Sequence, residues 1–279
     1  MGAPAFLVDN FFIITQYASH VVTAEEEPAG FEAFRAADGR RSSLDYATAT
    51  TANSDWWLKV DCGVARSATC VALDRGHNLF GKTVRVQWST DDFAVSVNDL
   101  VNGVLPTAVG VDASLDAALG VHTEEDAWLK RFASQSARYW RIFVPAMGAG
   151  LKPQVVGLWV GLTYEPGFVN FPVQEDQDEL VVAQTESEAG WLGRGFATPR
   201  RTGTIHLKLT TTAAYDTART HLQKNFGKGR PMWFVPDDAK TERAVLTIRP
   251  REPLGFTRDL GWFYPQASIA WQEHEPERP

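Results

Sequence analysis

The segment most suggestive of chemistry contains a full match to the phosphate-loop pattern of nucleotide hydrolases. The matching residues are Gly76, Gly81, Lys82 and Thr83. A working phosphate loop passes from a buried strand into a helix, whose N-terminal amides help to hold the phosphates. Here residues 83–89 instead alternate apolar and polar side chains with a period of two, which predicts a strand. We therefore interpret the match as chance and expect no nucleotide binding.

Other residue types that carry catalysis lack their usual arrangements. None of the histidines stands in an HExxH or HxH pattern, and no GxSxG elbow for a serine nucleophile is present. The carboxylate pair of a glycoside hydrolase has a spatial rather than a sequence spacing, so a polysaccharide-acting enzyme remains a third, weaker interpretation. We expect a protein that is not an enzyme.

The two cysteines, Cys62 and Cys70, flank a short predicted turn and lie in or beside predicted strands. A bridge between them is geometrically feasible. The favoured interpretation is a pair of small buried hydrophobic residues in a reducing compartment. Two cysteines without nearby histidine ligands do not make a zinc site.

Length and charge narrow the class of protein. A chain of 279 residues is long enough for two ordinary domains. The net charge of −7 gives no basic footprint for nucleic acid. No stretch approaches the roughly 20 apolar residues that span a bilayer, and the N-terminus lacks the basic region of a signal peptide. We expect no nucleic-acid partner, no membrane insertion and no signal peptide.

The elements of the first half follow an antiparallel β-sandwich pattern, with short β-like runs separated by turn residues. The predicted strands are 57–62, 68–73, 83–89, 138–144 and 155–164. Residues 100–135 carry few strand signals, and we expect a long excursion there with a short helix near Asp112–Leu119.

The second half follows a different pattern after a boundary near Pro166-Gly167. A helix is predicted from Thr211 or Thr212 to a C-terminal cap at Gly227. Its apolar face consists of Tyr215, Ala218, Leu222 and Phe226. The predicted strands are 180–184, 203–209, 231–235, 244–249 and 266–273. The fold class is therefore mainly β: a sandwich over 1–165, followed by an α+β domain over 166–279 with an antiparallel sheet and one amphipathic helix.

The first half resembles the discoidin family, the galactose-binding-like sandwich that also includes coagulation-factor C domains and carbohydrate-binding modules. The resemblance covers residues 5–165. It rests on the ordered set Ser19–Ala24, Ala37-Asp38-Gly39, Trp57–Gly63, Val71–Leu73, His77-Asn78, Val84–Asp91 and Arg138–Val144.

This resemblance implies a ligand site in loops at one end of the sandwich. Arg75, His77 and Asn78 then lie in a loop that meets a ligand or caps the strands. Most of the tryptophans are expected in the core, but Trp56 and Trp128 lie at loop or strand margins, where an aromatic ring can stack on a sugar.

The resemblance also implies a structural calcium beside those loops. Asp38, with Ser42 or Ser43, would supply the hard oxygen ligands that calcium needs. Leu158 stands near the position where the resemblance would lead one to expect a family glutamate, so the implied site has one carboxylate fewer. We therefore expect no cofactor, with calcium at Asp38 and Ser43 as the less favoured alternative.

The second half loosely resembles the ring-forming and tube-like domains of tailed-phage proteins, including distal tail proteins of the baseplate. This resemblance rests on the strand Gly203–Leu209 leading into a helix, and on the strand Trp233-Phe234-Val235 after it. It implies a structural virion protein of the tail tip. The oligomer interface would lie within 166–279, and the sandwich would project outward, where it could bind a host-surface glycan.

The expected partners are copies of the chain in a homo-oligomeric ring, other tail-tip and tail-tube proteins, and a host polysaccharide. The expected location is the virion tail tip, after synthesis in the host cytoplasm. The alternative is a soluble carbohydrate-binding module with an accessory domain that belongs to no virion.

Overall fold

The structure of this chain is a computed structural model in two compact units. It describes residues 5–13, 17, 19–37, 46–109, 115–123, 126–148, 150–166, 169–181, 184–186, 192–194, 198–208, 211–226, 232–235, 246–250, 255–257 and 266–273. The first unit comprises Met1–Glu165, Trp233–Val245 and Pro276–Pro279. The second unit comprises Pro166–Met232 and Leu246–Glu275.

The first unit is a β-sandwich, and the prediction of a mainly β chain is confirmed. It also contains a short 3-10 helix, η1, at Ala33–Ala36. Its strands are β1 (Ala5–Val8), β2 (Val21–Ala24), β3 (Ala47–Thr48), β4 (Trp56–Leu73), β5 (Thr83–Ser89), β6 (Asn98–Val104), β7 (Val121–His122), β8 (Trp128–Val144), β9 (Gln154–Val155), β10 (Leu158–Tyr164) and β15 (Met232–Val235).

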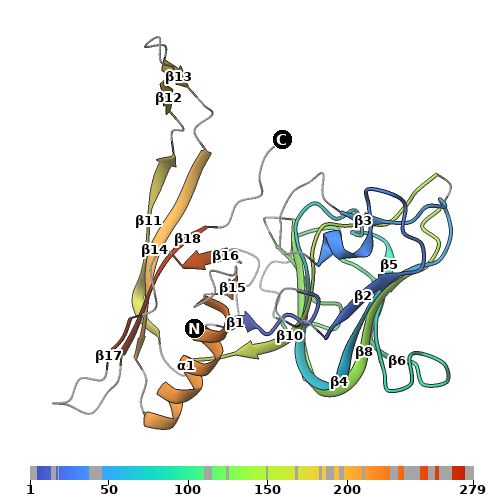
Figure 1. The fold of residues 1–279 in the computed structure, drawn as a ribbon, viewed down its shortest axis with the longest axis horizontal. Helices are drawn as coiled ribbons and strands as arrows, with labels where there is room; N and C mark the ends of the chain where they lie inside the picture. Colours follow the sequence, from blue (N-terminus) through green and yellow to red (C-terminus); the bar gives the residue numbers. More distant parts are fainter. Residues whose placement is uncertain are drawn as a thin grey trace. The chain divides into compact units, whose positions relative to one another are not determined.

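Two long strands, β4 and β8, build both layers of the sandwich. They pair antiparallel along their whole length, with an irregularity in register between Asp61 and Arg66. At that point both strands bend, so that their two halves lie on opposite sides of the core (Figure 1). One layer has the order β2-β4-β8-β5-β6, and the other has the order β15-β1-β10-β4-β8-β7.

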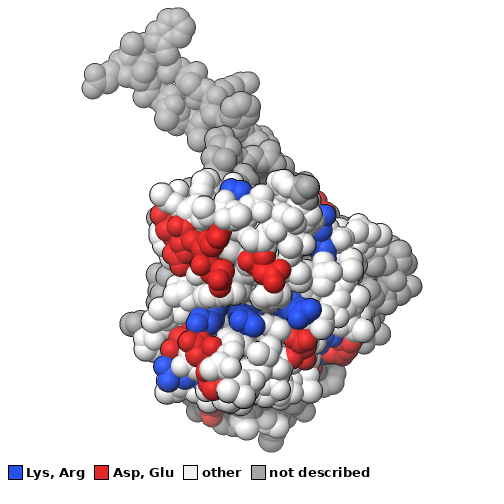
Figure 2. All heavy atoms as spheres, turned by 90° about the vertical axis from the view of Figure 1, so that its right-hand side faces the viewer, with Lys and Arg blue, Asp and Glu red and all other residues white. Residues whose placement is uncertain are grey.

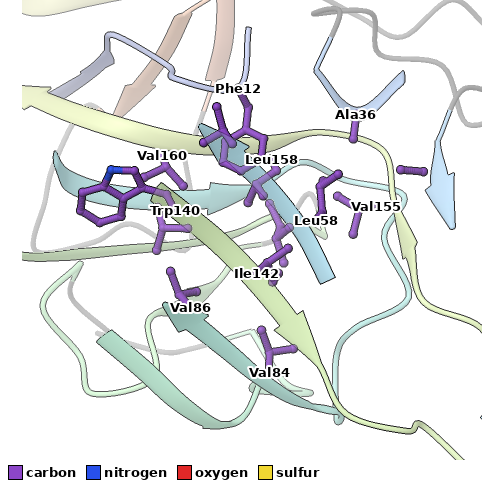
Figure 3. Close-up of a cluster of buried hydrophobic side chains, with 14 of the residues drawn as sticks. Phe12, Ala36, Leu58, Val84, Val86, Trp140, Ile142, Val155, Leu158 and Val160 are labelled. Atoms are coloured by element: carbon purple, nitrogen blue, oxygen red, sulfur yellow. The ribbon is translucent and has the colours of Figure 1, made fainter. Parts of the chain in front are cut away.

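The core lies between these layers and is lined by the inward side of each strand. Along the second half of β8, Trp140, Ile142 and Val144 are 0% exposed, whereas the residues between them are partly exposed. This period of two is what a half-buried strand requires. Figure 3 shows how side chains from β4, β5, β8, β9, β10 and the turn after β1 meet there, among them Phe12, Leu58, Val84, Val86, Trp140, Ile142, Val155, Leu158 and Val160.

The segment that matches the phosphate-loop pattern is a connection between β4 and β5, as predicted. It leads into a strand rather than a helix. Its amides are already used, because Gly81 N–H donates to Leu105 O and Lys82 N–H donates to Leu79 O. Gly76 and Gly81 have φ values of 92° and 71°, so glycine is needed there for the turn rather than for a phosphate.

The second unit contains an antiparallel sheet and, among its described residues, one α-helix. The sheet has the order β11-β14-β18-β16; β17 pairs with β18, and β12 pairs with β13. The elements are β11 (Val169–Val181), β12 (Gln184–Glu186), β13 (Leu192–Arg194), β14 (Thr198–Lys208), α1 (Thr212–Phe226), β16 (Leu246–Pro250), β17 (Gly255–Thr257) and β18 (Gln266–Glu273).

The helix α1 begins at the predicted residue and buries the described part of the predicted apolar face. Thr211 is the N-cap, because its Oγ1 accepts the Ala214 N–H at 3.1 Å. Tyr215, Ala218 and Leu222 are buried. The side chain of Phe226 and the predicted C-cap Gly227 lie outside what the structure describes.

The predicted helix at 112–119 is wrong over its described part, because residues 115–119 form turns. Backbone carbonyls there bond to β8 instead of to a helical turn. Leu115 O accepts the Arg131 N–H at 2.7 Å, and Ala117 O accepts the Lys130 Nζ at 2.6 Å. Pairing with a neighbouring strand therefore overrides the local helical propensity.

The predicted strand boundaries also differ in places. The strands expected at 57–62 and 68–73 are one strand, β4. The strand expected at 155–164 is two, β9 and β10, separated at Val156-Gly157. The break arises because Gly157 O leaves the ladder and accepts the Asp74 N–H at 2.9 Å.

Candidate functional site

The two tryptophans predicted to border a ligand site begin long strands, but their rings lie in the core. Trp56 and Trp128 are the first residues of β4 and β8, and both are 0% exposed. The Trp128 indole N–H donates to Leu119 O at 2.7 Å. A buried ring has no free face to offer a sugar, so neither residue contributes to the surface described below.

Asn78 and Arg75 lie in the loop that the discoidin resemblance places at the ligand end. Asn78 Nδ2 donates to Lys152 O at 2.8 Å, and its Oδ1 accepts the Gln154 N–H at 2.8 Å. Its amide thereby joins two loops. The Arg75 side chain is half-buried, and its Nε has no hydrogen-bond partner among the described residues.

His77, in the same loop, is buried against aromatic neighbours. Its Nδ1 accepts the Leu79 N–H at 3.1 Å, and its ring centroid lies 4.3 Å from that of Phe80. Phe80 also stacks with His122 at 3.5 Å. Burial lowers the pKa of His77 to about 4, so the imidazole is neutral near pH 7.

The predicted calcium ligands Asp38 and Ser43 lie outside the described residues. Within the described ranges, no group of His, Cys, Asp or Glu side chains is placed to hold a metal ion. Among the same residues, no helix is long and apolar enough to cross a membrane.

The two cysteines are free and buried, as the favoured interpretation predicted. Burial raises the pKa of Cys62 to about 12 and also raises the pKa of Cys70. Both thiols are therefore protonated at neutral pH, which is a poor state for a nucleophile.

A different surface brings aromatic and basic side chains together on the outer side of the layer β2-β4-β8-β5-β6. The residues that alternate with the core positions point to this side. We call the following half-buried set the aromatic–basic face: Trp57, Lys59, Arg85, Tyr139, Arg141 and Phe143.

Strand register places these residues beside one another. Phe143 lies between Trp57 on β4 and Arg85 on β5, its partners in the two ladders. Arg141 lies between Lys59 and Gln87 in the same way. Directly opposite side chains on neighbouring strands are about 5 Å apart at Cβ, so these rows form one continuous surface.

Each aromatic ring of the face has a cation over it. Lys59 Nζ lies 5.1 Å from the centre of a Trp57 ring. The guanidinium carbons of Arg85 and Arg141 lie 5.6 Å and 5.4 Å from the Phe143 ring centre. These distances are within the range of cation–π attraction, which fixes the long basic side chains against the sheet.

A chain of hydrogen bonds across three strands orients Arg141. Its Nε donates to Gln87 Oε1 at 2.7 Å, and Gln87 Nε2 donates to Asp99 Oδ1 at 2.6 Å. Asn102 Nδ2 donates to Asp99 Oδ2 at 2.9 Å and so completes the chain. Gln87 is 2% exposed, which makes it a fixed support rather than a contact residue.

The β5–β6 loop covers the same arginine from above. Phe93 has a φ of 65°, which is uncommon for a residue with a side chain, and its ring lies 3.9 Å from the Arg141 guanidinium carbon. Asp91 holds this loop, because its carboxylate accepts the Val95 N–H at 3.2 Å and the Ser96 N–H at 2.9 Å. A strained backbone conformation of this kind persists only where the surrounding contacts hold it in place.

Figure 2 views the side of the molecule on which these strands lie in Figure 1. Lys and Arg side chains form a row across that face, with Asp and Glu side chains above and below it. Two acidic residues bond to basic side chains of these strands: Asp92 Oδ1 accepts from Lys59 Nζ at 2.5 Å, and Asp61 Oδ1 accepts from Arg138 Nε at 2.7 Å.

Sequence reasoning did not find this face, although one of its strands carries a signal. In residues 138–144, the predicted strand, Tyr139, Arg141 and Phe143 alternate with Trp140 and Ile142. That alternation identifies an outward aromatic and basic stripe. The residues that stand beside it depend on the registers of β4 and β5, which the sequence does not state.

Comparisons with known proteins find likeness only among solved structures. No family model matches the chain, and no curated protein sequence matches it. A chitosan-binding module from the chitosanase/glucanase of Paenibacillus sp. IK-5 is 19% identical, with a TM-score of 0.40, over 55% of this chain and 98% of that one.

The family 32 carbohydrate-binding module of C. perfringens NanJ, solved with galactose, is 14% identical with a TM-score of 0.40. The likeness covers 58% of this chain and 99% of the module. A Ruminococcus gnavus GH29 fucosidase matches at 14% identity and a TM-score of 0.42, over 56% of this chain and 27% of the enzyme. The structural neighbours over about half of the chain thus include carbohydrate-binding modules.

Proposed function

We propose that the first unit binds carbohydrate, without catalysis, through the aromatic–basic face. The observation that carries this proposal is the row Trp57–Phe143–Arg85, in which aromatic rings and a guanidinium stand side by side on neighbouring strands. Aromatic rings pack against the apolar faces of sugar rings, and the polar side chains beside them bond to hydroxyl groups.

The rigidity of the face supports the same function. Arg141 is held by Gln87 and by the ring of Phe93, so less side-chain freedom is lost when a ligand binds. Ordering a long side chain at an interface costs about 0.5–1.5 kcal/mol, and a preorganised side chain avoids most of that cost. The resemblance of the sequence to discoidin-like modules points to the same class of ligand.

The test is binding of the intact protein to a panel of neutral and acidic polysaccharides, followed by calorimetry with oligosaccharides of any that bind. We expect Trp57→Ala and Phe143→Ala to weaken binding about tenfold, the effect of losing about 1.4 kcal/mol. Phe34→Ala is the matched control, because Phe34 is 45% exposed on η1 and lies outside the face.

The loop end remains the other location for a sugar site, and Arg75→Ala examines it in the same experiment. If Arg75→Ala abolishes binding while Trp57→Ala and Phe143→Ala do not, the site lies in the loop. If no polysaccharide binds, the proposal of a carbohydrate-binding function is wrong.

We further propose that the chain is a structural component of a phage tail tip, in which the second unit assembles and the sandwich meets a host-surface glycan. Support comes from the resemblance of residues 166–279 to tail proteins, and from the order of β14 followed by α1. Exposed sheet edges associate unless something covers them, and a closed ring of copies would do so.

This assembly is tested by light scattering of the intact protein, alone and with tail-tip partners. Several symmetric copies are expected. A chain that stays monomeric with every partner present, and still binds a glycan, supports the alternative of a soluble carbohydrate-binding module outside any virion.

A further inference from the structure

Two arginines of the aromatic–basic face have hydrogen-bond donors that the described part of the chain does not use. Arg85 lies over the Phe143 ring, and its buried Nε has no hydrogen-bond partner. Arg141 donates from Nε to Gln87 Oε1, and no hydrogen bond within the described residues uses the two terminal nitrogens of its guanidinium. An arginine carries five N–H donors in a fixed planar fork.

The neighbouring arginine on the same strand shows the contrast. Arg138 donates two hydrogen bonds to Asp61, from Nε to Oδ1 at 2.7 Å and from Nη2 to Oδ2 at 2.8 Å. It too lies over an aromatic ring, that of Tyr139, at 4.9 Å. Among the described residues, Arg138 thus has a carboxylate partner, whereas no carboxylate forms a hydrogen bond to Arg85 or Arg141.

Asp99, Glu25 and Asp92 all attract Arg141 electrostatically. Both oxygens of Asp99 accept hydrogen bonds, from Gln87 and from Asn102. Asp92 accepts from Lys59. Within the described residues, no carboxylate forms a hydrogen bond to either guanidinium, and both lie beside the Phe143 ring, in an arrangement that suits an incoming anion.

We propose that Arg85 and Arg141 bind the carboxylate of an acidic sugar that lies on the aromatic–basic face beside Phe143. The proposal rests on the proposed carbohydrate function and deepens it by naming the ligand class: glycans that contain uronic or other carboxylated sugars. The planar guanidinium fork matches a carboxylate in a bidentate geometry, and such charge-assisted bonds are about twice as strong as neutral ones.

Because the site is partly desolvated, an anion is attracted more strongly there than at an exposed site. Burial lowers the pKa of Arg141 from its ordinary value, and attraction to Asp99, Glu25 and Asp92 opposes that shift. A charged group that the fold has partly removed from water gains more from a carboxylate than an exposed one does.

The experiment compares each acidic oligosaccharide with its own methyl ester, so that the sugar ring is kept and the charge is removed. Oligomers of galacturonate, glucuronate, mannuronate and sialic acid are titrated into the intact protein by calorimetry. The proposal expects at least one acid to bind about tenfold or more tightly than its ester, the effect of one charge-assisted contact.

The variants identify the residues responsible. Arg85→Gln and Arg141→Gln should each weaken binding of the acid about tenfold and leave binding of the ester within about twofold. Arg138→Gln is the matched control and should leave both within about twofold, because Arg138 already has a carboxylate partner. Melting curves of each variant show that it is folded.

Three results would overturn the inference. Equal affinity for acid and ester, or binding of neutral glycans alone, removes the anionic subsite but leaves the carbohydrate function in place. Binding of sulfated dextran as tightly as any acidic sugar, with loss of both in moderate salt, means unspecific attraction of polyanions. Failure of every glycan, neutral or acidic, removes the carbohydrate function itself.

Discussion

Single residues on the outer sheet surface follow one repeated arrangement, an aromatic ring with a basic group above it. Lys59 lies over the Trp57 ring, Arg85 and Arg141 lie over the Phe143 ring, and Arg138 lies over the Tyr139 ring. Each cation gains attraction from the ring, and each ring is held in one place. The result is a set of rings and cations that hold one another in place on the outer side of the sheet.

The loop residue His77 makes the stability of the folded chain depend on pH. Its pKa is about 4 in the folded chain because of burial, against an ordinary value of 6.5. Between these values the unfolded chain takes up a proton that the folded chain does not. The contribution of His77 to the free energy of unfolding is therefore fully present above about pH 6.5. As the pH drops to 4, the free energy of unfolding falls by up to about 3 kcal/mol.

We predict that His77→Asn removes most of that loss. Asparagine keeps an acceptor near the Nδ1 position for the Leu79 N–H but does not titrate. Urea unfolding at pH 7.5, 5.5 and 4.5 measures the difference in free energy between wild type and variant. The variant should gain on the wild type as the pH falls, and parallel pH profiles would contradict the assignment.

At the scale of elements, the sandwich depends on how the segment after β1 lies on β10. Asn10 is 4% exposed, and its Oδ1 accepts the N–H groups of Phe12 and Val160 at 3.1 Å and 3.2 Å. A Cβ on Gly161 would stand 2.3 Å from Asp9 O, so only glycine allows the backbones this close. These contacts fix β10, which with β4 carries one wall of the core.

The helix α1 gives a stability prediction for the second unit. Leu222 is 0% exposed, and we expect Leu222→Ala to lower the free energy of unfolding by about 2–5 kcal/mol through lost burial and the cavity left behind. Gln223→Ala, at the exposed neighbouring position, should change it by about 0.5 kcal/mol or less. Calorimetric melting of both variants decides whether this helix face is buried as described.

At the scale of the whole molecule, the sequence predicts the fold class and several elements because they depend on local periodicity. The strands at 83–89 and 138–144 and the N-cap Thr211 are confirmed for that reason. The pairing of β1 with β15 depends on contacts between residues more than 200 positions apart, such as Phe6 and Phe234, which no local pattern states.

The candidate site was less predictable than the fold. The sequence placed Trp56 and Trp128 at margins correctly, but only the packing shows that their rings are buried. Arg85 and Arg141 carry no motif, and they become neighbours only through the registers of β5 and β8. A site built on a sheet face is therefore hidden from sequence, whereas a site built on one loop is not.

A crystal structure of the intact protein with the oligosaccharide that binds it best would show where the sugar lies. We predict a sugar ring within about 4 Å of the Phe143 ring, the distance of apolar contact, with its polar groups at Arg85 and Arg141. A sugar seated instead against Arg75 and the β4–β5 loop, with the sheet face empty, would contradict this prediction.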